Sequence, residues 1–195
     1  MIQVSEMKST TGARMIPSLE NGASRWYAAY TFPRHEKRVA EHLSGRSVEH
    51  FLPLHMMQRQ WRDRRKFVEF PLFPGYVFVR LELKDKLCVL EVPGIVHLVS
   101  FNGLPAPLSD HEIDKLRTGL SQKARVRPYP YTSTTGDITA GRRVRIHNGP
   151  FSGLEGKLVR RKGSVHVILS IEMIQRSLLV DVDVSSVEFL VPPRR

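Results

Sequence analysis

The sequence has a single cysteine, Cys88, in 195 residues. One thiol excludes an internal disulfide framework and any cysteine-based zinc site, and it fits a reducing cytoplasm. No apolar run approaches the ~18–20 residues that cross a bilayer. The N-terminus also lacks the apolar segment of a signal peptide. We therefore expect a cytoplasmic protein that does not interact with membranes.

Motifs of the common enzyme classes are missing as well. The sequence contains no phosphate-binding Gly-Lys-Ser/Thr loop and no nucleophile elbow around a serine. His35-Glu36 and His111-Glu112 lack the second histidine of a zinc-protease motif. The eight histidines are scattered singly, which is more typical of surface or capping residues than of metal ligands. We expect no catalysis, no cofactor and no bound metal.

Positive charge is what the chain has in excess. Its net charge is +11 and its pI is about 10.2. Such a balance favours an anionic partner, above all nucleic acid. A basic protein without such a partner is the alternative at this point.

The most informative stretch is residues 70–79, where two prolines interrupt an aromatic-rich run that continues as a strand. Pro74 fixes φ, and Gly75 permits a bend or a close approach of the backbone. A buried strand explains Val77 and Val79 well. It explains less well why so many aromatic residues lie beside two prolines, which suggests a surface for a partner.

Residues 1–24 are polar and aperiodic, and we expect a disordered leader. Residues 25–31 predict a strand with Trp26, Ala28 and Tyr30 on one face. After Phe32-Pro33 we expect a helix to about Arg46, because proline suits the first helical turn.

Basic side chains gather on that helix and on an exposed arm that follows it. The arm, residues 58–66, holds one acid and one tryptophan among its cations, and such a cluster is costly in a core. Interleaved arginine and tryptophan can pair with phosphates and stack on bases, whereas a solvated charged surface is the plain alternative. The predicted nucleic-acid-binding residues are Arg34, Lys37, Arg38, His42, Arg46, Arg59, Arg62, Arg64, Arg65 and Lys66.

The chain divides into two predicted domains of an α+β protein. Residues 25–123 predict an antiparallel sheet flanked by helices, with Ser109 and Glu112 forming a capping box for the last helix. Residues 124–137 predict a flexible linker, since they hold Pro128, Pro130 and a Ser/Thr-rich tract without periodicity. Residues 138–195 predict a small five-stranded, SH3-like β-barrel from short alternating strands.

Two motifs in the right order resemble one known family. Gly-Asp-Ile-Thr-Ala-Gly-Arg-Arg-Val-Arg-Ile and then Gly-Pro-Phe-Ser-Gly-Leu-Glu-Gly resemble the KOW motif. Trp26-Tyr27, the helix after Pro33 and Phe-Pro-Gly-Tyr-Val at 73–77 resemble the N-terminal domain of NusG-type transcription factors. The KOW positions are Gly149, Pro150, Phe151, Gly153 and Gly156.

The resemblance implies a monomeric transcription elongation and antitermination factor. In that family the N-terminal domain binds the clamp helices of RNA polymerase through an apolar pocket, close to DNA and to the nascent RNA. The KOW domain contacts termination factor Rho or a ribosomal protein. The matching pocket positions are Trp26, Tyr30, Phe73, Pro74, Tyr76 and Phe78. A ribosome-associated RNA-binding KOW protein is the alternative.

Some residues are more similar to the specialised, RfaH- and UpxY-like paralogues that act on a subset of operons. These are Tyr30, the basic arm and residues 171–177, which replace a Gly-Arg turn. In one specialised branch the C-terminal domain is helical. Here the glycines and Pro150 at 149–156 and the β-branched strands oppose helix. We expect a preformed barrel on a flexible linker, with the aromatic pocket open.

Overall fold

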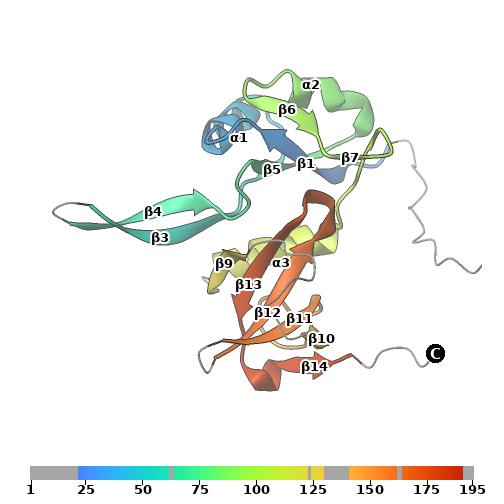
Figure 1. Ribbon diagram of the computed structural model, residues 1–195. Helices are drawn as coiled ribbons and strands as arrows, with labels where there is room; N and C mark the ends of the chain where they lie inside the picture. Colours follow the sequence, from blue (N-terminus) through green and yellow to red (C-terminus); the bar gives the residue numbers. More distant parts are fainter. Residues whose placement is uncertain (1–21, 62–63, 123, 130–140, 162–163, 191–195) are drawn as a thin grey trace, which may run out of the picture.

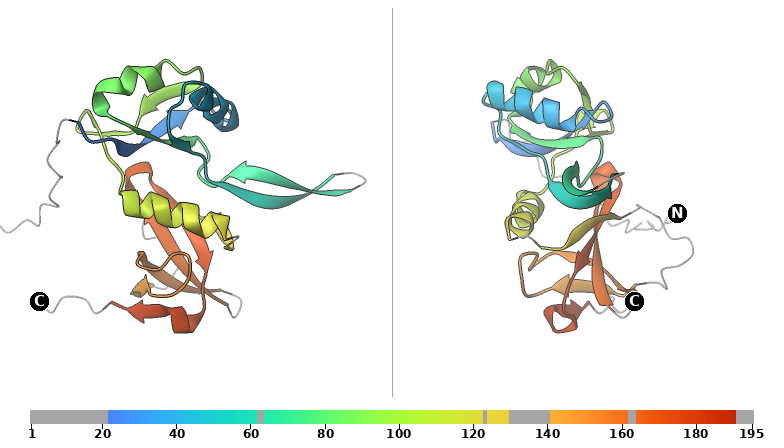
Figure 2. Two further views of the ribbon diagram at one scale, coloured as in Figure 1. Left: turned by 180° about the vertical axis from the view of Figure 1, so that it is seen from behind. Right: turned by 90° about the vertical axis from the view of Figure 1, so that its left-hand side faces the viewer.

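The computed structural model describes residues 22–61, 64–122, 124–129, 141–161 and 164–190 (Figure 1). An N-terminal sheet with two helices on one face lies above a C-terminal sheet, and a third helix lies between them (Figures 1 and 2). The predicted α+β class is confirmed. Among the residues described, no helix is long and apolar enough to cross a membrane.

The N-terminal sheet is antiparallel and has the strand order β2-β5-β1-β6. The central strands β1 and β5 place apolar side chains on both faces, so the middle of the sheet is covered on both sides. Its strands are β1 (Arg25–Thr31), β2 (His50–Phe51), β5 (Tyr76–Leu81) and β6 (Ile95–Leu98).

Helices α1 (Glu36–Gly45) and α2 (Lys86–Leu90) cover the first face, α2 following the 3-10 turn η1 (Leu83–Asp85). Val39 and Leu43 of α1 are one helical turn apart and pack on Tyr27 and Val77. Ala29, Val79 and Val89 belong to the same core. The helix predicted after Pro33 is present, and its apolar residues face the sheet.

The second face of the sheet carries Trp26, Ala28 and Phe78. It is covered by α3 (Asp110–Ser121), which follows a small Asn-Gly hairpin formed by β7 (Ser100–Phe101) and β8 (Leu104–Pro105). Ser109 precedes α3, but its side chain makes no capping hydrogen bond, so the predicted capping box does not form.

A long hairpin projects from this domain (Figure 1). It consists of β3 (Leu54–Gln60) and β4 (Arg65–Pro71), paired with each other and with no other strand of the described residues. We call residues 54–71 the hairpin arm. The exposed basic arm of the sequence prediction lies at its outer end.

The C-terminal sheet is antiparallel with the order β14-β10-β11-β12-β13-β9. The five predicted strands are there, but a sixth, β9, comes from the segment predicted as a flexible linker. That prediction is wrong for residues 126–129, which pair with β13, whereas residues 130–137 lie outside those described. The strands of the C-terminal sheet and the 3-10 turns between them are β9 (Val126–Tyr129), β10 (Arg143–Ile146), β11 (Glu155–Arg161), β12 (Ser164–Ile171), η2 (Glu172–Ile174), β13 (Arg176–Asp181), η3 (Val184–Ser186) and β14 (Val187–Phe189).

The leader predicted for residues 1–24 falls almost wholly outside the described part of the chain. The boundary predicted at residue 123 is less clear than the sequence suggests. Helix α3 packs on the N-terminal sheet and on the C-terminal sheet at once, and both share one core.

Candidate functional site

The aromatic residues predicted as a pocket come together on the second face of the N-terminal sheet. The rings of Phe73 and Phe78 meet edge to face with centroids 5.7 Å apart. Tyr30 lies beside Tyr76 at 5.5 Å. Trp26, Phe73 and Phe78 are buried, the two tyrosines are half-buried, and Pro74 is exposed. The cluster therefore has a buried base and a partly open rim.

The loop before β5 is held in place by a buried carboxylate. The Gly75 amide donates a 2.8 Å hydrogen bond to Oε1 of Glu36, at the start of α1. Gly75 has a φ of 86°, and a Cβ there would lie 3.2 Å from the Tyr30 ring. Only glycine fits this loop without strain, because its φ is left-handed and the tyrosine is close. Glu36 was not among the predicted site residues.

Helix α3 closes the cluster from below. Its Arg117 guanidinium lies 5.2 Å from the Trp26 ring centroid and 5.3 Å from the Phe51 ring centroid. Ile113 and Leu116 belong to the same core as Trp26. A partner that contacts the Trp26 and Phe78 rings must therefore displace α3. Tyr76 lies at the rim and can be contacted without moving this helix.

The C-terminal domain also reaches the cluster. The turn between β12 and β13 approaches the N-terminal sheet (Figure 1), and the Arg176 guanidinium lies 5.6 Å from the Tyr76 ring centroid. Ile171 and Ile174 share the core of Phe73 and Phe78. The predicted open pocket is therefore wrong. The prediction of strands rather than helices in the C-terminal half is confirmed.

The loop at residues 147–154 packs on α3. Phe151 is buried against Gly119, where a Cβ would overlap its ring. Lys115 Nζ donates a 3.2 Å hydrogen bond to Ser152 Oγ. Of the predicted motif residues, Gly149 and Gly153 have φ values of 88° and 91°. Pro150 is half-buried, and a Cβ on Gly156 would overlap the Ile168 carbonyl of the neighbouring strand.

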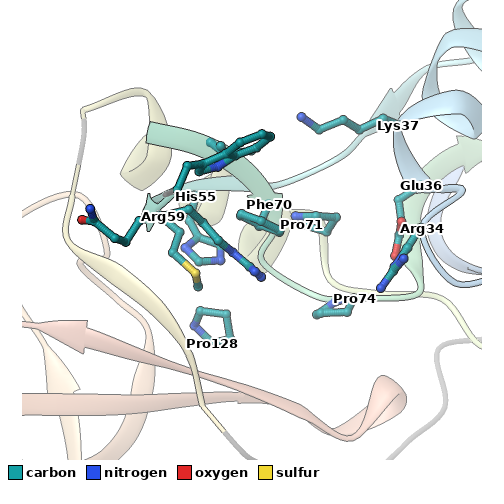
Figure 3. A pocket seen from close by; sticks show the side chains of 13 residues that line it. Arg34, Glu36, Lys37, His55, Arg59, Phe70, Pro71, Pro74 and Pro128 are labelled. Atoms are coloured by element: carbon teal, nitrogen blue, oxygen red, sulfur yellow. The ribbon is translucent and has the colours of Figure 1, made fainter. Parts of the chain in front are cut away.

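An open groove of about 920 Å³ runs along one face of the hairpin arm (Figure 3). Arg59 and Phe70 of the arm face the start of α1, where Arg34 and Lys37 lie, and Pro128 of β9 lies below (Figure 3). Burial lowers the pKa of His55, which favours the neutral form of its ring. The full lining is Arg34, Glu36, Lys37, His55, Met57, Arg59, Gln60, Trp61, Val68, Phe70, Pro71, Pro74 and Pro128.

The predicted nucleic-acid-binding residues separate into distinct groups. Arg34 precedes α1 with a φ of 65°, so it lies outside the helix on which its side chain was predicted to gather with those of Arg38 and His42. It lines the groove instead. Arg46 donates to the Cys88 carbonyl at 2.9 Å and so ties α1 to the end of α2.

The remaining cations lie on the arm. The Lys66 ammonium lies 5.9 Å from the Trp61 ring centroid. Arg65 donates to Gln60 Oε1 at 3.0 Å, Arg64 is exposed, and Arg62 lies outside the described residues. Sequence analysis missed Glu36, Arg117, Gly119 and Arg176. No periodicity marks them, because each acts through a contact distant in sequence.

Comparisons with known proteins agree with this architecture. The family model "Transcription termination factor nusG" matches residues 24–117. The protein "Transcription termination/antitermination protein NusG" of Vibrio vulnificus (strain CMCP6) is 31% identical over 144 residues, covering 68% of this chain and 76% of its own length. The protein of the same name from Lactococcus lactis is 28% identical over 179 residues, covering 84% and 91%.

A solved structure supports the fold. "Domain interaction in Thermotoga maritima NusG" aligns with a TM-score of 0.55 at 23% identity, covering 87% of this chain and 98% of the other. At this identity the structural match speaks for the fold alone. The family model and the sequence relatives together show that the chain belongs to the NusG family.

Proposed function

We propose that this protein binds RNA polymerase through the aromatic cluster of its N-terminal domain and modulates transcription elongation and termination. Its relatives are named transcription termination/antitermination proteins. The observation that carries the proposal is the rim formed by Tyr30 and Tyr76 above buried Phe73. Two half-exposed rings beside a rigid Pro-Gly loop are suited to anchoring an apolar helix surface. The clamp helices of polymerase are the proposed partner.

The N-terminal cations are proposed to contact DNA in the same complex. Arg34, Lys37 and Arg59 gather at one groove rather than spreading over the surface. Arg38 and His42 on α1, with Arg64, Arg65 and Lys66 on the arm, are further proposed DNA contacts, because α1 and the arm both border the groove. Arg46 is not included, because its guanidinium binds the backbone of α2.

The C-terminal domain is proposed to bind Rho or a ribosomal protein through the loop at residues 147–154. Phe151 and Gly153 of that loop lie against α3. Access to these residues therefore requires the domains to separate. A specialised role on a subset of operons is supported by Tyr30 and by residues 171–177, which form the interdomain turn. No catalytic step is part of the proposal, and the proposed compartment is the cytoplasm.

A ribosome-associated RNA-binding protein remains the second candidate, because a basic chain with a small C-terminal sheet suits RNA as well. The aromatic rim favours polymerase, since RNA-backbone contacts need cations rather than a tyrosine pair on a rigid loop.

The test is retention of the full-length protein on immobilised RNA polymerase. Tyr76→Ala removes a rim ring, and loss of an aromatic anchor costs about 2 kcal/mol or more, which weakens binding about thirtyfold. Phe101→Ala is the matched control, because Phe101 is exposed on the small β7–β8 hairpin. Equal binding by a folded Tyr76→Ala protein would contradict the proposed rim. Binding to ribosomes but not to polymerase would favour the second candidate.

A further inference from the structure

The two faces of the hairpin arm differ in composition. Pairing of Met57 with Val68 and of Arg59 with Lys66 places these side chains on one face, which we call the inner face. Phe70 lies on it, and Trp61 follows at its outer end. The outer face carries Gln58 and Phe67 instead. Most of the arm residues that line the groove belong to the inner face; Gln60 and Pro71 are the exceptions.

On the inner face each cation lies against an aromatic ring. The Arg59 guanidinium lies 5.0 Å from the Phe70 ring centroid. The Lys66 ammonium takes the corresponding place over the exposed Trp61 ring, at 5.9 Å. Arg59 and Lys66 are paired with each other on this face, with Trp61 beyond them at the outer end and Phe70 two inner-face pairs closer to the domain.

The wall of the groove opposite the arm adds positive charge, and the one carboxylate in its described lining already accepts a hydrogen bond. Arg34 and Lys37 line the groove from the start of α1. Lys37 is 3.7 Å from Glu69, but both side chains are about half exposed, so this ion pair is weak. Glu36, the carboxylate among the described lining residues, is buried and bound to the Gly75 amide. Lining cations thus outnumber the lining acid, and that acid already has a donor.

This chemistry suits an unpaired nucleic-acid strand. Bases stack on aromatic faces, and the phosphates between them bind nearby cations. A duplex keeps its bases stacked inside and cannot offer them to Trp61 or Phe70. An acidic peptide would use the cations but would leave the exposed ring of Trp61 without a flat partner.

We propose that the inner-face groove binds single-stranded DNA, with bases on Trp61 and Phe70 and phosphates on Arg34, Lys37 and Arg59. The assignment of this groove rests on the proposed function, in which DNA lies beside the N-terminal domain. It adds to that function an unpaired strand as the ligand and a site at which its bases stack. Pro128 of β9 borders the same groove. The site is therefore bounded by both domains in the docked arrangement.

Tryptophan fluorescence of the full-length protein gives a direct test. The chain has two tryptophans, of which Trp26 is 1% exposed and Trp61 is 55% exposed. Single-stranded oligothymidine is expected to quench the exposed one. Binding constants are then measured by fluorescence anisotropy of labelled oligothymidine for wild type, Trp61→Ala and Arg59→Gln. The controls are Phe67→Ala on the outer face and Arg142→Gln beside Phe189 in the C-terminal domain.

Trp61→Ala is expected to weaken binding about tenfold, since stacking of one base carries roughly that effect. Arg59→Gln should flatten the salt dependence, whereas the controls Phe67→Ala and Arg142→Gln should weaken binding less than Trp61→Ala and Arg59→Gln. The proposal would be overturned if substitutions on both faces weakened oligothymidine binding equally. It would also be overturned if duplex DNA or polyglutamate bound as tightly as oligothymidine, or if oligothymidine did not bind at all. Tighter binding of oligouridine would overturn the DNA assignment. Retention on polymerase, measured separately with Tyr76→Ala, distinguishes these failures from failure of the proposed function.

Discussion

Arg176 and Tyr76 join the two domains across the candidate polymerase-binding rim, with the guanidinium carbon 5.6 Å from the ring centroid. Gln175, immediately before this arginine, has a left-handed backbone with φ 49° and ψ 49°. That turn brings the chain from η2 into β13 and places Arg176 at its start. The tyrosine side is set by the Gly75 loop and Glu36. Both partners thus stand on fixed backbone rather than on free loops.

Arg176→Ala should shift the domains toward separation. An exposed cation–π contact is worth about 0.5–1 kcal/mol, so the docked population relative to the separated one should fall a few-fold. Small-angle scattering and ¹⁵N relaxation of the full chain would measure it. Arg142→Ala is the control, because its guanidinium lies over Phe189 within the C-terminal sheet. Identical scattering and relaxation for all three proteins would contradict a role in docking.

Gly119→Ala should displace the loop at residues 147–154 from α3. A methyl group would overlap the Phe151 ring, although alanine favours the helix by about 1 kcal/mol. Chemical shifts of residues 149–153 should therefore change while α3 gains helical stability. Gly45→Ala is the control, since its Cβ would meet nothing within 4 Å. Adding Phe151→Ala to Gly119→Ala should relieve the overlap, and failure of that rescue would argue against this contact.

Glu36→Ala should destabilise the N-terminal domain. It leaves the buried Gly75 amide without its acceptor, which costs about 2 kcal/mol in the free energy of unfolding. Urea denaturation measures this change. Glu41→Ala, an exposed position on the same helix, should change the free energy by less than about 0.5 kcal/mol. Equal effects of the two substitutions would mean that the Glu36–Gly75 bond contributes nothing specific.

Stability should fall with acid through His55. Burial lowers the pKa of this ring in the folded protein, while in the unfolded chain it is about 6.5. Below that pH the unfolded state binds more protons, so the free energy of unfolding falls as the pH falls toward the lowered folded value. Urea denaturation between about pH 7 and pH 5 should show a shallower slope for His55→Gln than for wild type. A slope for His55→Gln equal to the wild-type slope would contradict a contribution from this ring.

Local patterns predicted the elements that depend on neighbouring residues. Alternation in residues 25–31 placed Trp26 and Ala28 opposite Tyr27 and Ala29, as the two cores require. The five C-terminal strands followed from β-branched alternation, and the Gly149–Gly153 spacing indicated a tight loop. These features are fixed by propensity and by solvent, which act on short windows of sequence.

Contacts between distant segments could not be predicted in the same way. The pattern at residues 171–177 showed a departure from the family but not the packing of Ile174 against the N-terminal core. Prolines made 124–137 look irregular, yet Pro128 lies opposite Leu178 in the sheet. Arg46 looked like one more surface cation until its backbone acceptors were seen. Each outcome depends on a partner that local sequence does not specify.

Because of strand β9, the two domains can separate at either of two interfaces. Ser121 ends α3 and Val126 begins β9, so only a short connection separates these two elements. If the domains separate between α3 and the N-terminal sheet, β13 stays paired with β9 and no hydrogen bond between strands is lost. If they separate between β9 and β13, the pairs from Ser177↔Tyr129 to Val180↔Val126 are broken, and an unsatisfied edge faces solvent, ready to accept a strand from another chain. Separation at the first interface can therefore be reversible, whereas separation at the second exposes a strand that can pair with another chain.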